Sequence, residues 1–148
     1  MIYRLIVVLF FFLVSFTDNK EKTQKFGYIK FQYLGETAKP HPILFFYLPN
    51  SIDTSYENFY TYKFEVTTIQ FNCIIKAVAK KKKPIDSFEL RDPLGVLIEQ
   101  DGESTIEYIK SKSVINEMFN TISSYFNDVA TKEKVQECLS QIFRRLPE

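Results

Sequence analysis

The chain has 148 residues, a length at which one domain is expected. Its apolar share of 45% and charged share of 25% are those of a soluble globular protein and exclude a disordered or collagen-like chain. With 19 basic and 18 acidic residues the chain has no basic field, so nucleic acid is not an expected partner.

The N-terminal segment has the pattern of a secretory signal peptide. Arg4 precedes an apolar run from Leu5 to Phe16 in which Ser15 is the one polar residue. A helix of this run is too short for the ~30 Å hydrocarbon core of a bilayer. We therefore predict a signal peptide over residues 1–17 and an exported protein, either secreted or periplasmic. An uncleaved tether, with membrane contact only through this segment, is the alternative.

The remainder of the chain is predicted to form a single domain behind a flexible tail. Loss of residues 1–17 removes Arg4 and no acidic residue, which leaves a formal net charge of zero. Long-range electrostatic attraction to charged partners is then weak. Residues 18–25 contain no apolar residue, so we expect a solvated tail, followed by one domain over residues 26–148.

Three strands are predicted in the first half of this domain. Aromatic and β-branched residues favour a strand over residues 26–33, which ends before Gly35. The apolar run at residues 43–48, between turn residues, is typical of a strand covered on both faces. Apolar and polar residues alternate over residues 58–66, which predicts a half-buried strand.

The hydrophobic period changes to that of a helix at Thr67. Thr67 and Gln70 match a capping box, and helical spacing relates Phe71, Ile74, Ile75 and Val78. Lys80–Lys83 suit the negative end of a helix, and Pro84 does not continue one. These signals predict a helix over about residues 68–82.

Two short strands are predicted next, over residues 87–91 and 96–100. Asp92-Pro93-Leu94-Gly95 is expected to join them in a tight turn, because proline and glycine suit such turns. Asp101-Gly102 marks a second turn.

Residues 104–110 fit either a strand or the start of a long helix. Ile106 and Ile109 point away from the apolar stripe that follows, so we prefer a strand over about residues 105–109. Helices are predicted from Ser113 to Asn127 and from Thr131, a candidate N-cap, to about Leu146.

The predicted order is β-β-β-α-β-β-(β)-α-α. Strands joined by short turns favour antiparallel pairing. We therefore expect an α+β fold in which three helices pack on one face of an antiparallel sheet of five to six strands.

Residue types for metal or cofactor chemistry are scarce. His41, the one histidine, lies between two prolines, and no acid except Glu36 is near it, so a catalytic role is not expected. One imidazole and two distant thiols do not match zinc spacing, and we predict no metal and no cofactor. An even cysteine count in an exported chain makes Cys73–Cys138 a candidate disulfide, with two free thiols as the alternative.

Aromatic residues, at 16%, are the most unusual feature of the composition. If helices cover only one sheet face, the other exposes tyrosine and phenylalanine, which marks a ligand or partner surface. The candidate binding residues are Tyr28, Tyr33, Tyr47, Tyr60 and Tyr62. Ordinary boundary tyrosines with buried rings and solvated hydroxyls are the alternative interpretation.

The sequence therefore favours a non-enzymatic binding or interaction protein whose partner is an unknown protein or small ligand. The alternative is a small exported hydrolase that uses the carboxylates of Asp86, Glu89 and Asp92. Charged residues on the solvated face of a hairpin have a simpler explanation, which is solubility.

Overall fold

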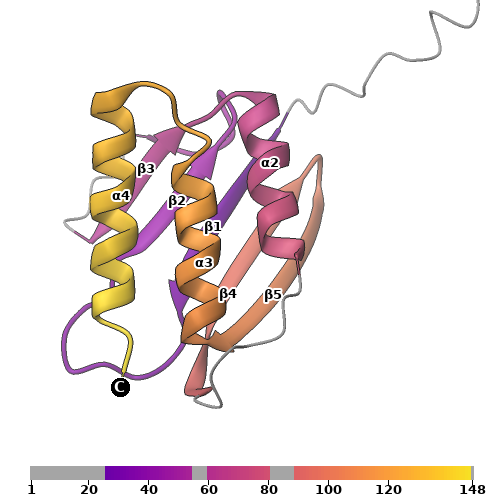
Figure 1. Ribbon diagram of the computed structural model, residues 1–148. Coiled ribbons are helices and arrows are strands. Elements are labelled where there is room, and N and C mark those ends of the chain that lie inside the picture. The colour runs from indigo at the N-terminus through magenta and orange to yellow at the C-terminus, as the bar shows by residue number, and fades with distance from the viewer. Residues whose placement is uncertain (1–25, 55–59, 81–88, 148) are drawn as a thin grey trace, which may run out of the picture.

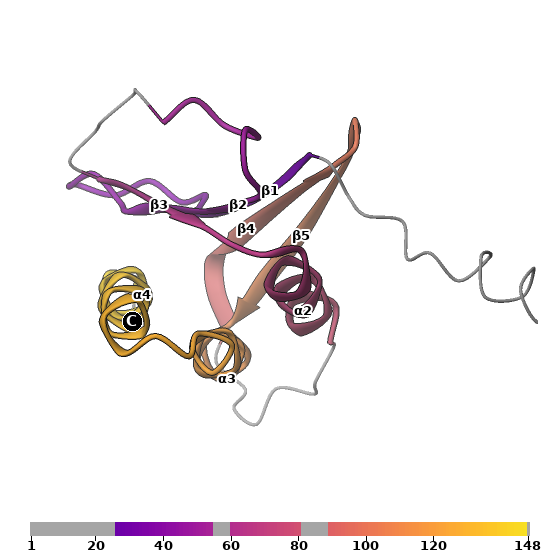
Figure 2. The same ribbon diagram turned by 90° about the horizontal axis from the view of Figure 1, so that it is seen from above.

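Helices cover one face of a single sheet. The computed structural model describes residues 26–54, 60–80 and 89–147, so the predicted signal peptide and tail lie outside the described residues. The α+β class is confirmed, in the order β-β-β-α-β-β-α-α. The helices lie side by side in front of the sheet in Figure 1, and Figure 2 shows them on the same side of it.

The described part of the chain forms eight elements. The strands are β1 (Gly27–Tyr33), β2 (Ile43–Tyr47), β3 (Thr61–Glu65), β4 (Glu89–Gln100) and β5 (Glu103–Ser111). The helices are α2 (Thr68–Ala79), α3 (Lys112–Ser123) and α4 (Val129–Arg144). None of the described helices is long and apolar enough to cross a membrane.

The sheet is mixed, which differs from the purely antiparallel sheet that we expected. The strand order is β3-β2-β1-β4-β5, and β2 and β3 are parallel while the other pairs are antiparallel. Residues 48–60 connect β2 to β3 and are numerous enough for a crossover back to the starting end of β2. There the Ile43 N–H donates to the Tyr60 carbonyl at 2.7 Å.

The predicted tight turn at residues 92–95 is wrong, because β4 runs straight through it. The register of β4 against β5 shifts near Pro93, where a bulge tolerates a residue that lacks an N–H. The Pro93 carbonyl accepts the Leu34 N–H at 3.0 Å. A Cβ at Gly95 would lie 2.9 Å from Leu34 Cδ1. Pro93 thus lies at a bulge, and Gly95 makes room for the Leu34 side chain. Because no turn divides β4, the sheet has five strands.

The strand preferred for residues 105–109 is confirmed, since β5 covers it. Asp101 and Gly102 have φ values of 46° and 88°, the two positive angles of a type I′ hairpin turn. They join β4 directly to β5.

The helix starts follow local capping. The Thr67–Gln70 capping box is confirmed, with Thr67 Oγ1 accepting the Gln70 N–H at 3.2 Å. Thr131 is not an N-cap: Asp128 holds that position, and its carboxylate accepts the Thr131 N–H at 2.9 Å. The Thr131 hydroxyl also donates to the Asp128 carboxylate, at 2.7 Å. This side-chain hydrogen bond, followed by the one from the Thr131 N–H, holds the pKa of Asp128 below its ordinary value, so the charged acceptor is favoured at the helix start.

The core lies between the sheet and the helices. The rings of Phe31 and Phe46 lie 5.9 Å apart on neighbouring strands, and Phe119 of α3 is 6.0 Å from Phe31. Phe126 extends the cluster, 5.7 Å from Phe46. Such ring pairs contribute about 0.5–1.5 kcal/mol beyond their buried area. These aromatic contacts join the sheet to the helical layer.

Gly27 is required where α2 meets the sheet. A Cβ at this position would lie 2.6 Å from Phe71 Cζ and 2.9 Å from the Glu99 carbonyl oxygen. We expect Gly27→Ala to lower the free energy of unfolding by about 1–3 kcal/mol, because the backbone oxygen does not move aside. Urea denaturation should show a lower midpoint with an unchanged slope.

A double variant provides the control for this prediction. Phe71→Leu removes one of the two groups that the new methyl meets, so the combined cost with Gly27→Ala should be smaller than the sum. Strictly additive costs would contradict the proposed clash.

Candidate functional site

The strands expose a second face on the side away from the helices, here called the outer face. Cross-strand partners share a face, so the register defines its members. Tyr28 pairs with Tyr47 and Glu99, and Lys30 pairs with Phe45 and Leu97. On the edge strand, Ile106 pairs with Leu97 and Tyr108 with Gly95.

Residues 48–54 lie over the β1–β3 half of the outer face, as Figure 2 shows. The Ser51 hydroxyl accepts the Gly27 N–H at 2.9 Å, and Lys63 Nζ donates to the Asp53 carbonyl at 2.9 Å. Tyr28, Phe45 and Tyr47, on the same face of these strands, are only half-buried. This half of the face is therefore partly covered by the chain itself.

The β4–β5 half of the outer face carries an apolar surface, here called the β4–β5 patch. It consists of Leu34, Leu97, Ile106 and Tyr108. Three of them are largely exposed: Leu34 at 49%, Ile106 at 52% and Tyr108 at 61%. Leu34 lies over Gly95, which is the partner of Tyr108, and half-buried Leu97 is the partner of Ile106. The four side chains are thus neighbours on one surface.

The structure divides the predicted tyrosines between two faces. Tyr28 and Tyr47 are partners on the outer face, where burial and the Glu99 carboxylate raise the pKa of Tyr28. Tyr33 is 4% exposed in the core, and the Tyr62 hydroxyl donates to Gln141 Oε1 of α4 at 2.8 Å. Exposed Tyr60 precedes β3. The five therefore do not form one surface.

Sequence reasoning missed the β4–β5 patch. The signal was present, because Ile106 and Tyr108 alternate with polar residues within a segment that was preferred as a strand. Leu34 lies outside any strand and Leu97 belonged to a separate predicted hairpin, so nothing local connected the four.

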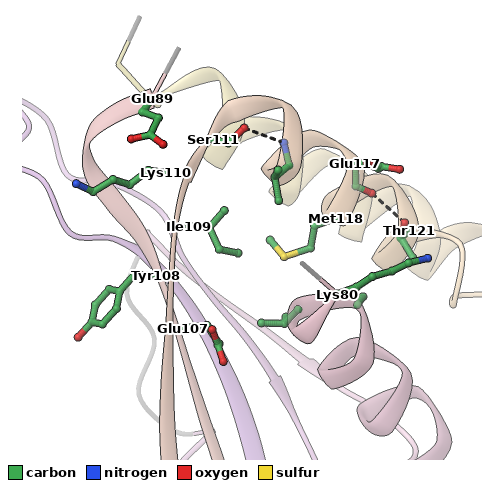
Figure 3. Close-up of a pocket in the computed structure, with 13 residues that line it drawn as sticks. Lys80, Glu89, Glu107, Tyr108, Ile109, Lys110, Ser111, Glu117, Met118 and Thr121 are labelled. Atoms are coloured by element: carbon green, nitrogen blue, oxygen red, sulfur yellow. Dashed lines mark hydrogen bonds between the residues drawn. The ribbon is translucent and has the colours of Figure 1, made fainter. Parts of the chain in front are cut away.

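A pocket of about 400 Å³ lies on the helical side, between α2, α3 and β5 (Figure 3). Its apolar wall includes Val78, Ile109 and Met118, and Figure 3 shows Ile109 and Met118 pointing into it while Tyr108 points the opposite way. Charges of both signs complete the lining, from Lys80, Glu89, Glu107, Lys110 and Glu117. The volume is in the range of small-molecule sites.

Of the acids of the hydrolase alternative, the two that the structure describes do not both line this pocket. Asp86 lies outside the described residues, and Glu89 lines the pocket. Asp92 is not part of the lining; its carboxylate lies near Tyr33, whose pKa is raised by burial and by Asp92. Over the described ranges, no group of three or more His, Cys, Asp or Glu side chains is placed to hold a metal ion.

His41 packs in the loop between β1 and β2. Its ring lies 5.2 Å from that of Tyr33, and Arg145 Nη1 donates to the adjacent Pro40 carbonyl at 3.0 Å. Both ring nitrogens are buried, and neither makes a hydrogen bond of normal geometry within the described residues. Burial lowers the pKa of His41, and the positive charge of Arg145 lowers it further. The backbone groups of Pro42 and Arg145 raise the pKa and so offset part of this decrease. His41 therefore acts as a neutral side chain that packs the loop against Tyr33.

Both cysteines are free thiols in the structure. Cys73 is half-exposed on α2 and Cys138 is buried on α4. Figure 1 shows α3 between these two helices. Burial, together with the nearby Glu137 charge, raises the pKa of Cys138 to about 11.

The His41 environment predicts acid sensitivity. The folded pKa lies below the ordinary value of 6.5, so the unfolded chain binds the proton more readily. The contribution of neutral, buried His41 to the free energy of unfolding is therefore fully present above pH 6.5. It is lost as the pH falls through 6.5 and then through the folded pKa. Urea unfolding from about pH 7.5 to 5.5 should show a smaller decrease for His41→Phe than for the unsubstituted protein. Equal decreases would contradict this.

The thiol environments predict selective alkylation. Iodoacetamide should label Cys73 of the native protein roughly tenfold or more faster than Cys138, because a buried thiol with a raised pKa forms little thiolate. Both should react in denaturant, as mass spectrometry of peptides would show. An intact mass lower by two hydrogens, with neither thiol reactive, would establish the bridge instead.

Comparison of the chain with protein-family models, with curated proteins and with solved structures finds no match in any of the three. Function is therefore inferred from the described side chains and their geometry.

Proposed function

We propose that the protein is a non-enzymatic binding module whose protein partner packs on the β4–β5 patch. The observation that carries this proposal is the exposure of Ile106 and Tyr108, both above one half, beside exposed Leu34. Clustered exposed apolar side chains with a polar rim are typical of partner surfaces. An aromatic residue at such a surface often dominates the binding free energy.

The surroundings of the patch support this role. Lys30 and Gln32 flank it on β1, and Lys110 follows it on β5, so a polar rim surrounds the apolar centre. Backbone pairing fixes β4 between β1 and β5, so binding of a partner carries little cost for ordering the backbone beneath the patch.

The hydrolase alternative has weaker support. Catalysis by paired carboxylates requires acids that converge on one cleft. Glu89 lines the pocket and Asp92 does not. Export remains part of the proposal and is supported by the apolar run after Arg4.

Site-specific crosslinking tests the proposed surface. A photoreactive phenylalanine analogue replaces Tyr108 in one version of the full chain and Gln136, exposed on α4, in another. Expressed in its own organism, the protein should form one discrete crosslinked product from position 108 and none from position 136.

Charge substitutions provide the matched controls. Ile106→Lys should reduce the crosslinked product from position 108 about tenfold or more, because it buries a charge in the interface. Asn116→Lys adds the same charge on exposed α3 and should leave the yield unchanged. Equal yields with and without Ile106→Lys, or the same product from position 136, would overturn the proposal.

A further inference from the structure

The edge of the sheet beside the β4–β5 patch points to the form of the partner. We propose that the partner adds an extended strand along β5, with apolar side chains on the outer face and basic side chains on the helical face. This inference rests on the proposed function, because it concerns the same surface. Within the described ranges, β5 is the last strand of the sheet, and no other strand pairs with its far edge.

Two hydrogen bonds between the β4 and β1 segments establish which backbone groups of β4, and through its register which groups of β5, face each neighbour. Asp101 N–H donates to the Phe26 carbonyl at 3.1 Å, and the Pro93 carbonyl accepts from Leu34 at 3.0 Å. Odd-numbered residues of β4 therefore direct their backbone toward β1, and even-numbered residues direct theirs toward β5.

The same alternation continues into β5. Its odd-numbered residues are the partners of even-numbered β4 residues, as in Ile98 with Thr105. They direct their N–H and C=O groups toward β4. The even-numbered residues, which are Ser104, Ile106, Tyr108 and Lys110, thus direct theirs toward the open edge.

The side chains of β5 define the chemistry of the added strand. Ile106 and Tyr108 lie on the outer face and favour apolar neighbours there. Glu103 and Glu107 share the opposite face of β5. Glu103 is exposed, and Glu107 is half-buried at the pocket. A strand that alternates apolar and basic residues would match both faces, since opposite charges across strands are favourable.

A second copy of this chain fits the edge less well. The antiparallel register that pairs all of β5 with itself, Glu103 to Ser111, places Glu107 opposite Glu107. Directly opposed like charges destabilise a strand pair, and inward-pointing charge is a common protection against edge-to-edge association.

Synthetic peptides test the inference on the full chain. A peptide that alternates valine and lysine should bind about tenfold more tightly than one that alternates valine and glutamate. Titration should shift the amide resonances of residues 104–110. N-methylation along one edge of the lysine peptide should abolish binding, because it removes the donors that pair with β5.

Variants of β5 separate charge, side chain and backbone. Glu107→Lys should reverse the preference between the two peptides. Ser104→Pro removes an N–H that faces the open edge and should weaken binding about tenfold or more, with little effect on folding. Ser104→Ala keeps that N–H but loses the hydroxyl that donates to Glu99, so it is the matched control and should retain affinity.

The outcomes distinguish this inference from the proposed function. Strand addition is overturned if the lysine peptide does not bind at millimolar concentration, if it binds no better than the glutamate peptide, or if N-methylation has no effect. It is also overturned if sedimentation shows a dimer that Ser104→Pro dissociates. The proposed function survives these results if Ile106→Lys still reduces the yield of the crosslinked product from position 108 while Asn116→Lys does not.

Discussion

The packing of Phe31 against Phe46 and Phe119 is the contact on which the rest of the molecule depends. It joins two strands to α3 and thereby commits one face of the sheet to the helical layer. Because side chains alternate along a strand, burial of one set of residues under the helices places the intervening residues on the opposite face. The outer face, with Tyr28, Tyr47 and the β4–β5 patch, is a consequence of how the core is filled.

The bulge near Pro93 has an equally large effect on the surface. It allows β4 to continue for its full length, so that β5 pairs along it as the edge of the sheet. A tight turn at the same place would have folded β4 onto itself and left Ile106 and Tyr108 in another position. The proposed partner surface therefore depends on a local irregularity that accommodates a residue without an N–H.

The two faces of β5 have different chemistry, and the proposed interaction uses both. The outer side chains provide apolar area, which contributes most to affinity, whereas Glu103 and Glu107 provide selectivity for charge. The open edge supplies backbone groups that any extended segment pairs with, so side chains determine which segment is preferred. The pocket on the helical side lies next to Glu107 but has lining charges of both signs.

The sequence by itself determined the features that depend on neighbouring residues: the Thr67 capping box, the Asp101-Gly102 turn, the strand within residues 104–110 and the α+β class. Only the tertiary structure decided the parallel pairing of β2 with β3, the continuity of β4 through Pro93 and the separation of Tyr28 from Tyr33 and Tyr62. Capping, turns and periodicity act over a few residues and leave a local pattern. Strand partners, bulges and exposed patches arise from contacts between segments far apart in the chain. No pattern of neighbouring residues in the sequence indicates which of these contacts form.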